Sequence, residues 1–319
     1  MAPTLHATAA GGLGWWRVQG SEVALPEVAS GFHDAYRVQT LDARLRERRL
    51  LQALERFRAA GIHPVVGKGW AIARFYPRPG LRPYGDLDLH VAPEAYEHAA
   101  AVQPAGEEHD LGVDLHRGLP RVGRPWAEVA AHSVEVELGT ARVRVLGQED
   151  HLALLCAHLL FHGAWRPFWL CDVAALVEAT RPDFDWAYLM TLPRRQVEQI
   201  RLVVALAHRL LGADVSRTPW PPEGPIPSWL PRATLRAWGR GGHYTLTTPI
   251  ALAGGSGGSL LDAVRARWPN PIEVTYRWRA PYDGTPRFPI QLLDVAVRAT
   301  RALMGAPRAL TRRLSPGEP

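Results

Sequence analysis

Three aspartates stand where the sequence could assemble a metal site. Asp86 and Asp88 alternate with apolar residues along 86–91, which is the pattern of a β-strand. On such a strand the acidic side chains share one face and the apolar ones enter the core. Asp114 lies on a second predicted strand, 113–116, of similar pattern. If the two strands pair side by side, the three carboxylates converge.

Neighbouring carboxylates repel one another unless a cation lies between them. Hard oxygen ligands favour Mg²⁺, with Mn²⁺ as the alternative. Two such ions roughly 4 Å apart are typical of phosphoryl-transfer sites. We therefore expect Asp86, Asp88 and Asp114 to be catalytic and to bind two Mg²⁺ ions. A solvated acidic strand face without metal is the alternative that an Asp-x-Asp pattern alone leaves open.

A glycine-flanked lysine precedes these acids. Gly67, Lys68 and Gly69 lie between a predicted strand, 62–66, and a predicted short helix, 70–76. Glycines let the backbone approach a phosphate, and the first N–H groups of a helix can donate to one. A P-loop is excluded because glycine, rather than serine or threonine, follows the lysine, and the preceding glycine spacing is also wrong.

Lys68 is the only lysine among the 37 lysine and arginine residues. A compact ammonium is not interchangeable with a guanidinium against a phosphate, so this lysine is a candidate phosphate ligand, although chance could also leave one. Arg82, four residues before Asp86, is within reach of a triphosphate, and a solvated loop arginine is equally consistent with its position. We expect Gly67, Lys68, Gly69 and Arg82 to bind a nucleotide.

Together these residues resemble the signature of the uncharacterised nucleotidyltransferases of the polymerase-β-like superfamily. The matching residues are Gly67-Lys68-Gly69, Tyr76-Pro77, Arg82, Asp86-Leu87-Asp88-Leu89 and Asp114-Leu115-His116. A following helical region, with His158, His162, Trp169 and Asp172, is similar as well, so the resemblance covers about 41–176. It implies a nucleotidyltransferase fold, an NTP substrate and two metals. The superfamily's usual Gly-Ser pair is absent here, and the roles of His158, His162 and Asp172 stay open.

The element pattern predicts an α+β fold, with a small mixed, palm-like sheet domain followed by a mainly helical domain. We expect an irregular N-terminal segment at 1–40, a nucleotidyltransferase domain at 41–146 and a helical domain at 147–319. The last domain should end in a basic amphipathic helix at 289–304.

Composition bounds the partners and the location. The 319 residues carry a net charge of +6, which favours phosphate-bearing ligands or nucleic acid, or is only a mild composition bias. The longest apolar run, 152–161, is too short to span a bilayer, and no signal-peptide pattern is present. Two cysteines predict no disulfide framework. We expect a cytoplasmic protein with no membrane partner.

The sequence therefore predicts a metal-dependent transfer of an NMP from an NTP to a hydroxyl of a small-molecule or peptide acceptor, with release of pyrophosphate. An RNA-, tRNA- or protein-directed, toxin-like nucleotidyltransferase is the alternative among enzymes. A non-catalytic nucleotide-binding module on the same fold is the alternative outside them. The NTP, the acceptor, the pathway and the oligomeric state are left open.

Overall fold

The computed structural model describes residues 10–21, 25–103, 112–239 and 268–300. The chain divides into two compact units, Met1–Leu159 with Arg166–Ile226, and Leu160–Trp165 with Pro227–Pro319. The boundary predicted after residue 146 falls inside the first unit, so the division into a catalytic and a helical domain stays a prediction. None of the helices in the described ranges has the length and apolar character needed to cross a membrane.

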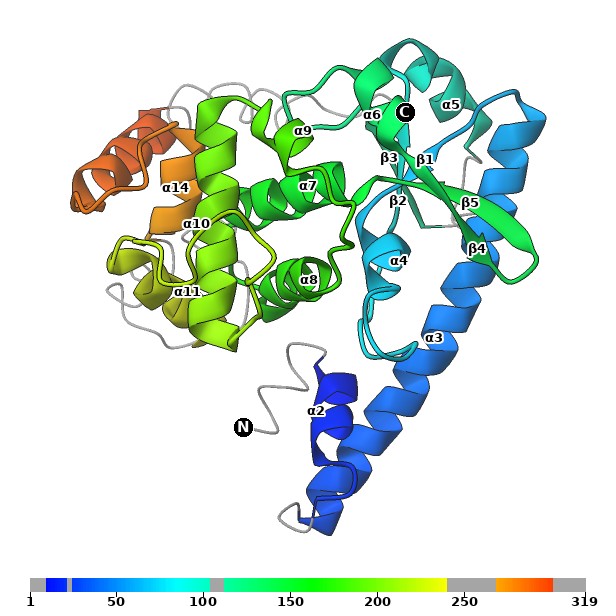
Figure 1. The fold of residues 1–319 in the computed structure, drawn as a ribbon, viewed down its shortest axis with the longest axis horizontal. Helices are drawn as coiled ribbons and strands as arrows, with labels where there is room; N and C mark the ends of the chain where they lie inside the picture. Colours follow the sequence, from blue (N-terminus) through cyan, green and yellow to red (C-terminus); the bar gives the residue numbers. More distant parts are fainter. Residues whose placement is uncertain (1–9, 22–24, 104–111, 240–267, 301–319) are drawn as a thin grey trace, which may run out of the picture. The chain divides into compact units, whose positions relative to one another are not determined.

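The first unit contains the strands and most of the helices (Figure 1). In chain order its elements are α2 (Gly11–Val18), α3 (Pro26–Ala59), β1 (Val65–Val66), α4 (Lys68–Ala73), β2 (Leu87–Val91), η1 (Pro93–Ala95), α5 (Tyr96–Val102), β3 (Val113–Arg117), α6 (Trp126–His132), β4 (Val134–Leu138), β5 (Ala141–Val145), α7 (Gln148–Phe161, whose end enters the second unit), α8 (Pro167–Glu178), α9 (Trp186–Met190) and α10 (Arg194–Leu211). The second unit contains α11 (Trp229–Gly239), α14 (Pro271–Arg277) and a helix over 288–300. Residues 301–304 of the predicted C-terminal helix lie outside the described residues.

The five strands form one mixed sheet in the order β3-β2-β1-β5-β4. β2 pairs with β3 in parallel and with β1 antiparallel, whereas β1 and β5 are parallel. β4 and β5 form an antiparallel hairpin around Gly139 and Thr140. The predicted α+β class with a small mixed sheet is thus confirmed.

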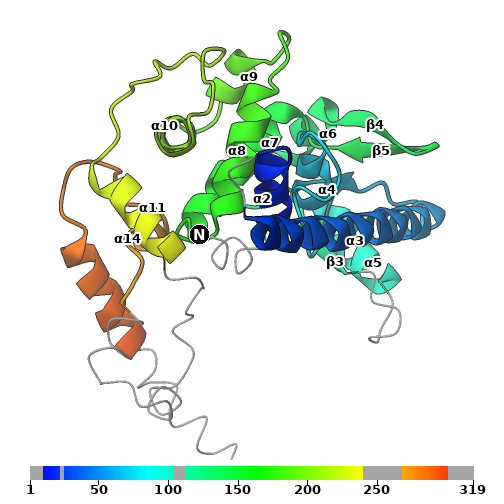
Figure 2. The same ribbon diagram turned by 90° about the horizontal axis from the view of Figure 1, so that it is seen from below.

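One face of the sheet carries the apolar core. Leu87, Leu89 and Val91 of β2 are buried there together with residues of α3 and α5, as the alternating pattern predicts. Figure 2 shows α3 and α5 lying close together. The helix α3 contributes buried residues including Leu50, Leu54 and Phe57. Because strand side chains alternate, Asp88 and His90 lie on the opposite face. Both are also buried, as is typical of a central strand covered on two sides.

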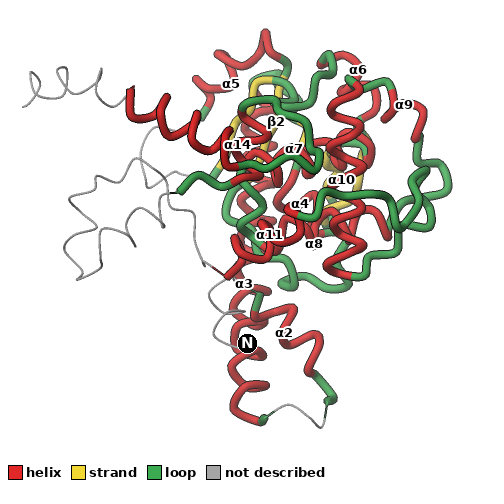
Figure 3. The backbone as a smooth tube through the Cα atoms, turned by 90° about the vertical axis from the view of Figure 1, so that its left-hand side faces the viewer, coloured by secondary structure: helices red, strands yellow, loops and turns green. Residues whose placement is uncertain are grey.

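The N-terminal part differs from the irregular segment predicted for 1–40. It contains α2 and the first turns of the 34-residue α3, and these two helices pack side by side (Figure 3). α3 begins with Pro26, a residue whose missing N–H costs nothing in a first helical turn. Leu41 and Leu45 of α3 are 67% and 54% exposed. The residues that α3 buries are Phe32, Ala43, Leu50, Ala53, Leu54 and Phe57.

A buried ion pair ties the segment after α4 to α8. Arg82 donates from Nε to Asp172 Oδ1 at 3.0 Å and from Nη2 to Asp172 Oδ2 at 2.6 Å. Tyr76 donates its hydroxyl to the same carboxylate at 2.8 Å. The Asp172 side chain is 0% exposed and that of Arg82 is 8% exposed, so each charge depends on the other for compensation. This two-bond geometry fixes the chain just before β2.

Removing one partner of this pair should destabilise the protein strongly. Asp172→Leu leaves the buried guanidinium uncompensated, which typically costs about 3–5 kcal/mol of unfolding free energy. The double variant Arg82→Met/Asp172→Leu should recover much of that loss, because it removes both charges at similar volume. Urea unfolding followed by circular dichroism measures all three proteins. A single variant as stable as the wild type would show that the pair does not stabilise the fold.

Candidate active site

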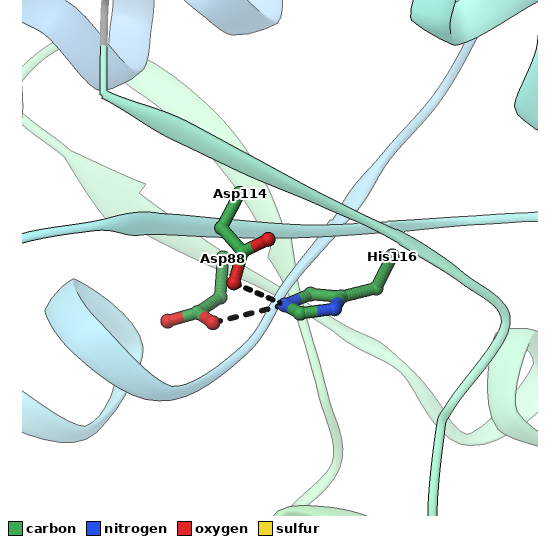
Figure 4. A group of neighbouring side chains, drawn as sticks. All are labelled: Asp88, Asp114 and His116. Atoms are coloured by element: carbon green, nitrogen blue, oxygen red, sulfur yellow. Dashed lines mark hydrogen bonds and ion pairs between the residues drawn. The ribbon is translucent and has the colours of Figure 1, made fainter. Parts of the chain in front are cut away.

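The parallel pairing of β2 and β3 sets Asp88 beside Asp114 and His90 beside His116. Residues paired in register on adjacent parallel strands share a face. On that face one ligand atom each of Asp88, Asp114 and His116 lies within 4.8 Å of the others (Figure 4). The side-by-side pairing expected for the two acidic strands is therefore present.

Both carboxylates already have cationic or donor partners within the protein. His116 Nε2 lies 3.0 Å from Asp88 Oδ1 and 3.2 Å from Asp114 Oδ2. The ammonium of Lys68 forms an ion pair with the same oxygen of Asp88. The Asp88 side chain is only 7% exposed, whereas that of Asp114, on the edge strand, is 52% exposed. The cluster of Asp88, Asp114, His116 and Lys68 is thus buried at Asp88 and exposed to solvent at Asp114.

The pKa values follow from these contacts. Burial raises the pKa of Asp88, but the hydrogen bond from His116 and the charge of Lys68 outweigh it and hold the pKa below its usual value. The hydrogen bond from His116 lowers the pKa of Asp114 in the same way. Burial acts to lower the pKa of His116, and the bonds to Asp114 and Asp88 raise it above its usual value overall. Two ionised carboxylates are therefore held next to an imidazole with a raised affinity for protons.

Asp86 is the predicted ligand that the structure does not bring into this group. It is exposed and precedes β2, which begins at Leu87. Because it precedes the first residue of the strand, the strand alternation that would orient it beside Asp88 does not extend to it. Its role in metal binding stays a prediction. His116 was given no role from the sequence, although its spacing from Asp114 puts both on one strand face, which is a signal that could have been used.

Gly67 directly follows β1 and is hydrogen-bonded to β2. Its N–H donates to the carbonyl oxygen of Asp88 at 3.0 Å. A Cβ on this residue would lie 2.7 Å from His90 Nε2, so no side chain fits without displacing the imidazole. The need for glycine is therefore steric, and the Gly67 N–H is already used inside the protein.

Lys68 follows with φ +39°, in the left-handed region that side chains rarely adopt. Its own N–H donates to His151 Nε2 at 3.1 Å. Gly69, with φ +31°, continues the irregular turn, and α4 is only six residues long. Among the groups predicted to bind phosphate here, the amides of Gly67 and Lys68 are thus engaged, and the Lys68 ammonium lies at the carboxylates. The predicted nucleotide contacts of Gly67, Lys68 and Gly69 stay predictions.

Arg82 is the fourth residue predicted to bind nucleotide. It is buried and held by Asp172, as described above. The structure therefore gives Arg82 a structural partner, and a contact with triphosphate stays a prediction. Asp172, whose role the sequence left open, is the residue that orients it.

The donor chemistry of the cluster fits a divalent cation. Asp88 and Asp114 offer hard oxygens, and His116 adds a nitrogen donor once its Nε2 is unprotonated. Carboxylates alone suit Mg²⁺, while an imidazole in the set favours metals such as Mn²⁺ over Mg²⁺. Three donors can hold one ion. A second ion, as predicted from the sequence, requires further oxygens from Asp86 or from a substrate.

Two buried imidazoles predict that the protein loses stability in acid. Burial lowers the pKa of His90 to about 4 and that of His151 to about 3. An imidazole in the unfolded chain has a pKa of about 6.5, so below that pH the unfolded state binds more protons than the folded state. The free energy of unfolding should therefore fall from about pH 6.5 toward about pH 4. The lowered pKa values of Asp88 and Asp114 affect stability only at lower pH.

Urea midpoints at about pH 7, 6 and 5 measure this dependence. The wild-type midpoint should decrease at each step, and it should decrease less in His151→Gln, which has no imidazole to protonate on unfolding. The raised pKa of His116 adds stability at acid pH that is lost above about pH 6.5, so it does not produce this decrease. A midpoint that stays constant down to pH 5 would contradict the neutral buried state of both imidazoles.

Comparison with known proteins agrees with the sequence resemblance. A family model described as uncharacterised nucleotidyltransferase matches residues 12–212, which is more than half of the chain. The match includes β1, β2 and β3, and with them Asp88, Asp114, His116 and Lys68. No curated protein and no solved structure matches the chain. On the family match, the chain belongs to the uncharacterised nucleotidyltransferases.

Proposed function

We propose that this protein is a metal-dependent nucleotidyltransferase that moves an NMP from an NTP to a hydroxyl of a small-molecule or peptide acceptor. The observation that supports it most is the in-register pairing of Asp88 with Asp114, which gathers two carboxylates and His116 in a family member. A non-catalytic binding module would have no need to place ionised carboxylates side by side beside the family's lysine.

The residues have separate roles in this proposal. Asp88 and Asp114, with His116 beside them and Asp86 as a further expected ligand, would hold the divalent cations, which would supply positive charge for the triphosphate. Lys68 adds a positive charge for the phosphates from the buried side of the cluster. Asp114, on the open edge strand, faces the side from which an acceptor can enter.

The reaction needs positioning more than covalent chemistry from the protein. The acceptor oxygen forms a bond to the α-phosphorus while the bond from that phosphorus to the bridging oxygen of the β-phosphate breaks. Pyrophosphate leaves with that oxygen. The hydroxyl proton is accepted or oriented by Asp114, a carboxylate whose lowered pKa keeps it ionised at neutral pH.

A labelling experiment identifies the acceptor class. The protein is incubated with Mg²⁺ or Mn²⁺, each of the four α-³²P-labelled NTPs and a cell extract separated into small molecules, proteins and RNA. A new labelled compound in the small-molecule fraction, either a peptide or another molecule distinct from the NTP, supports the proposal. Label in the protein fraction would assign the protein-directed alternative. Label in RNA would assign the nucleic-acid-directed alternative, to which the net charge of +6 is also suited. Absence of label from every fraction, with pyrophosphate release also absent, would contradict a transferase.

Asp88→Asn should abolish this transfer. A neutral amide cannot supply the charge that the cation requires, so we expect a loss of roughly three orders of magnitude or more in rate. The amide oxygen can still accept bonds from Lys68 and His116, so circular dichroism should show a folded protein. Asp183→Asn is the matched control, because the Asp183 side chain is 71% exposed and pairs only with Arg181 among the described residues. Near-normal transfer by Asp88→Asn would refute the site assignment.

Lys68→Arg should weaken NTP binding, and Lys68→Ala should weaken it further. A planar guanidinium on a left-handed residue beside Asp88 cannot reproduce the pose of the ammonium. Loss of a charge-assisted contact typically costs about 1.5–3 kcal/mol, or roughly one to two orders of magnitude in affinity. Isothermal titration with Mg²⁺ and a non-hydrolysable NTP analogue measures the change. Arg142→Ala, an exposed hairpin position, is the control, and wild-type affinity in both Lys68 variants would remove this lysine from the nucleotide site.

A further inference from the structure

His151 is a buried residue that neither the sequence nor the proposed reaction assigns to the site. It is 1% exposed and lies in the first turns of α7. Its Nε2 accepts the backbone N–H of Lys68 at 3.1 Å, across 83 residues of sequence. Lys68 in turn is the residue whose ammonium pairs with Asp88. The imidazole is therefore linked to Asp88 through Lys68.

The order of the strands explains how a residue so distant in sequence reaches this turn. β5 runs parallel to β1, with Val66 opposite Val145, and the N–H of Leu146 donates to the carbonyl of Val66 at 3.1 Å. The chain then enters α7 at Gln148, directly beside the end of β1. His151 thus contacts the turn that follows β1, because the parallel strands β1 and β5 both end at the same end of the sheet.

The contact matters because the Lys68 backbone is strained. A non-glycine residue at φ +39° costs on the order of 1 kcal/mol and persists only where the surroundings hold it. The Gly67 N–H anchors the turn on one side through the Asp88 carbonyl, and His151 anchors the Lys68 N–H itself. Burial keeps the imidazole neutral, so one of its ring nitrogens carries no proton, and the bond from the Lys68 N–H identifies that nitrogen as Nε2.

We propose that His151 is a positioning residue: by accepting the Lys68 N–H it holds this backbone in the left-handed conformation that directs the ammonium to Asp88 and, on the proposed function, to the triphosphate. A shorter acceptor at this position leaves the turn free to relax, and the ammonium then points elsewhere. His151 itself contacts no substrate in this scheme.

The single lysine of the chain gives a direct test. Protein labelled only with ¹⁵N-lysine shows one backbone amide in an NMR spectrum, and that amide is the proposed donor. His151→Gln places its Oε1 where Nε2 was and should keep the amide protected from hydrogen exchange. His151→Asn has the same chemistry but is one methylene shorter. It should lose the bond and exchange roughly fivefold faster, as expected for a hydrogen bond with a net value of about 1 kcal/mol.

Nucleotide binding provides the second measurement. His151→Asn should raise the KM for NTP, or lower analogue affinity, with a smaller effect than Lys68→Ala. The double variant should be no worse than Lys68→Ala alone, since the imidazole acts through the lysine. His151→Gln should restore the wild-type values.

The outcomes separate this inference from the proposed function. Equal exchange rates of the lysine amide in the Gln and Asn variants, both folded, would overturn the role of His151 whatever the activity. Additive losses in the double variant would overturn it as well. A faster-exchanging amide in His151→Asn, in a protein whose wild type neither binds nor transfers nucleotide, would support the positioning and reject the proposed function.

Discussion

The site depends on one electrostatic constraint, which is that an almost buried carboxylate, Asp88, lies directly beside a second one. The register of β2 and β3 places Asp114 next to it. Burial alone would raise the pKa of Asp88 and favour its protonated form. The partners that prevent this come from two directions, Lys68 from the turn after β1 and His116 from β3. A divalent cation at the same oxygens would perform the same compensation with a stronger charge.

The neighbouring features follow from that requirement. Lys68 can reach Asp88 only from a sharp turn, which the left-handed backbone provides. Gly67 must lack a side chain because His90 fills the space beside it. Arg82, held by Asp172, anchors the chain five residues before β2 begins at Leu87. Each of these residues is ordinary by itself, and together they define the position of one carboxylate.

Most of what could be predicted from the sequence came from the alternation of polar and apolar residues along the strands. The alternation around Asp88 identified the strand and its buried face, and the matching pattern at Asp114 identified its neighbour. Polar contacts between distant segments could not be predicted in the same way. His151 and Asp172 lie 83 and 90 residues from the groups they hold, and no local pattern encodes such a pairing. Asp86 was misjudged as a strand residue because alternation in sequence does not show where a strand begins.

The most direct test of the cation site uses the lysine side chain. Protein labelled with ¹³C at lysine Cε gives one signal, that of Lys68, whose ammonium pairs with Asp88. Addition of Mn²⁺ with a non-hydrolysable NTP analogue places a paramagnetic ion at the carboxylates, and the signal should broaden beyond detection at about one equivalent. Asp88→Asn/Asp114→Asn, treated identically, should keep the signal. Loss of the Lys68 signal in the wild type but not in this variant is the predicted result. A wild-type signal that remains sharp at saturating Mn²⁺ would contradict a metal site at Asp88.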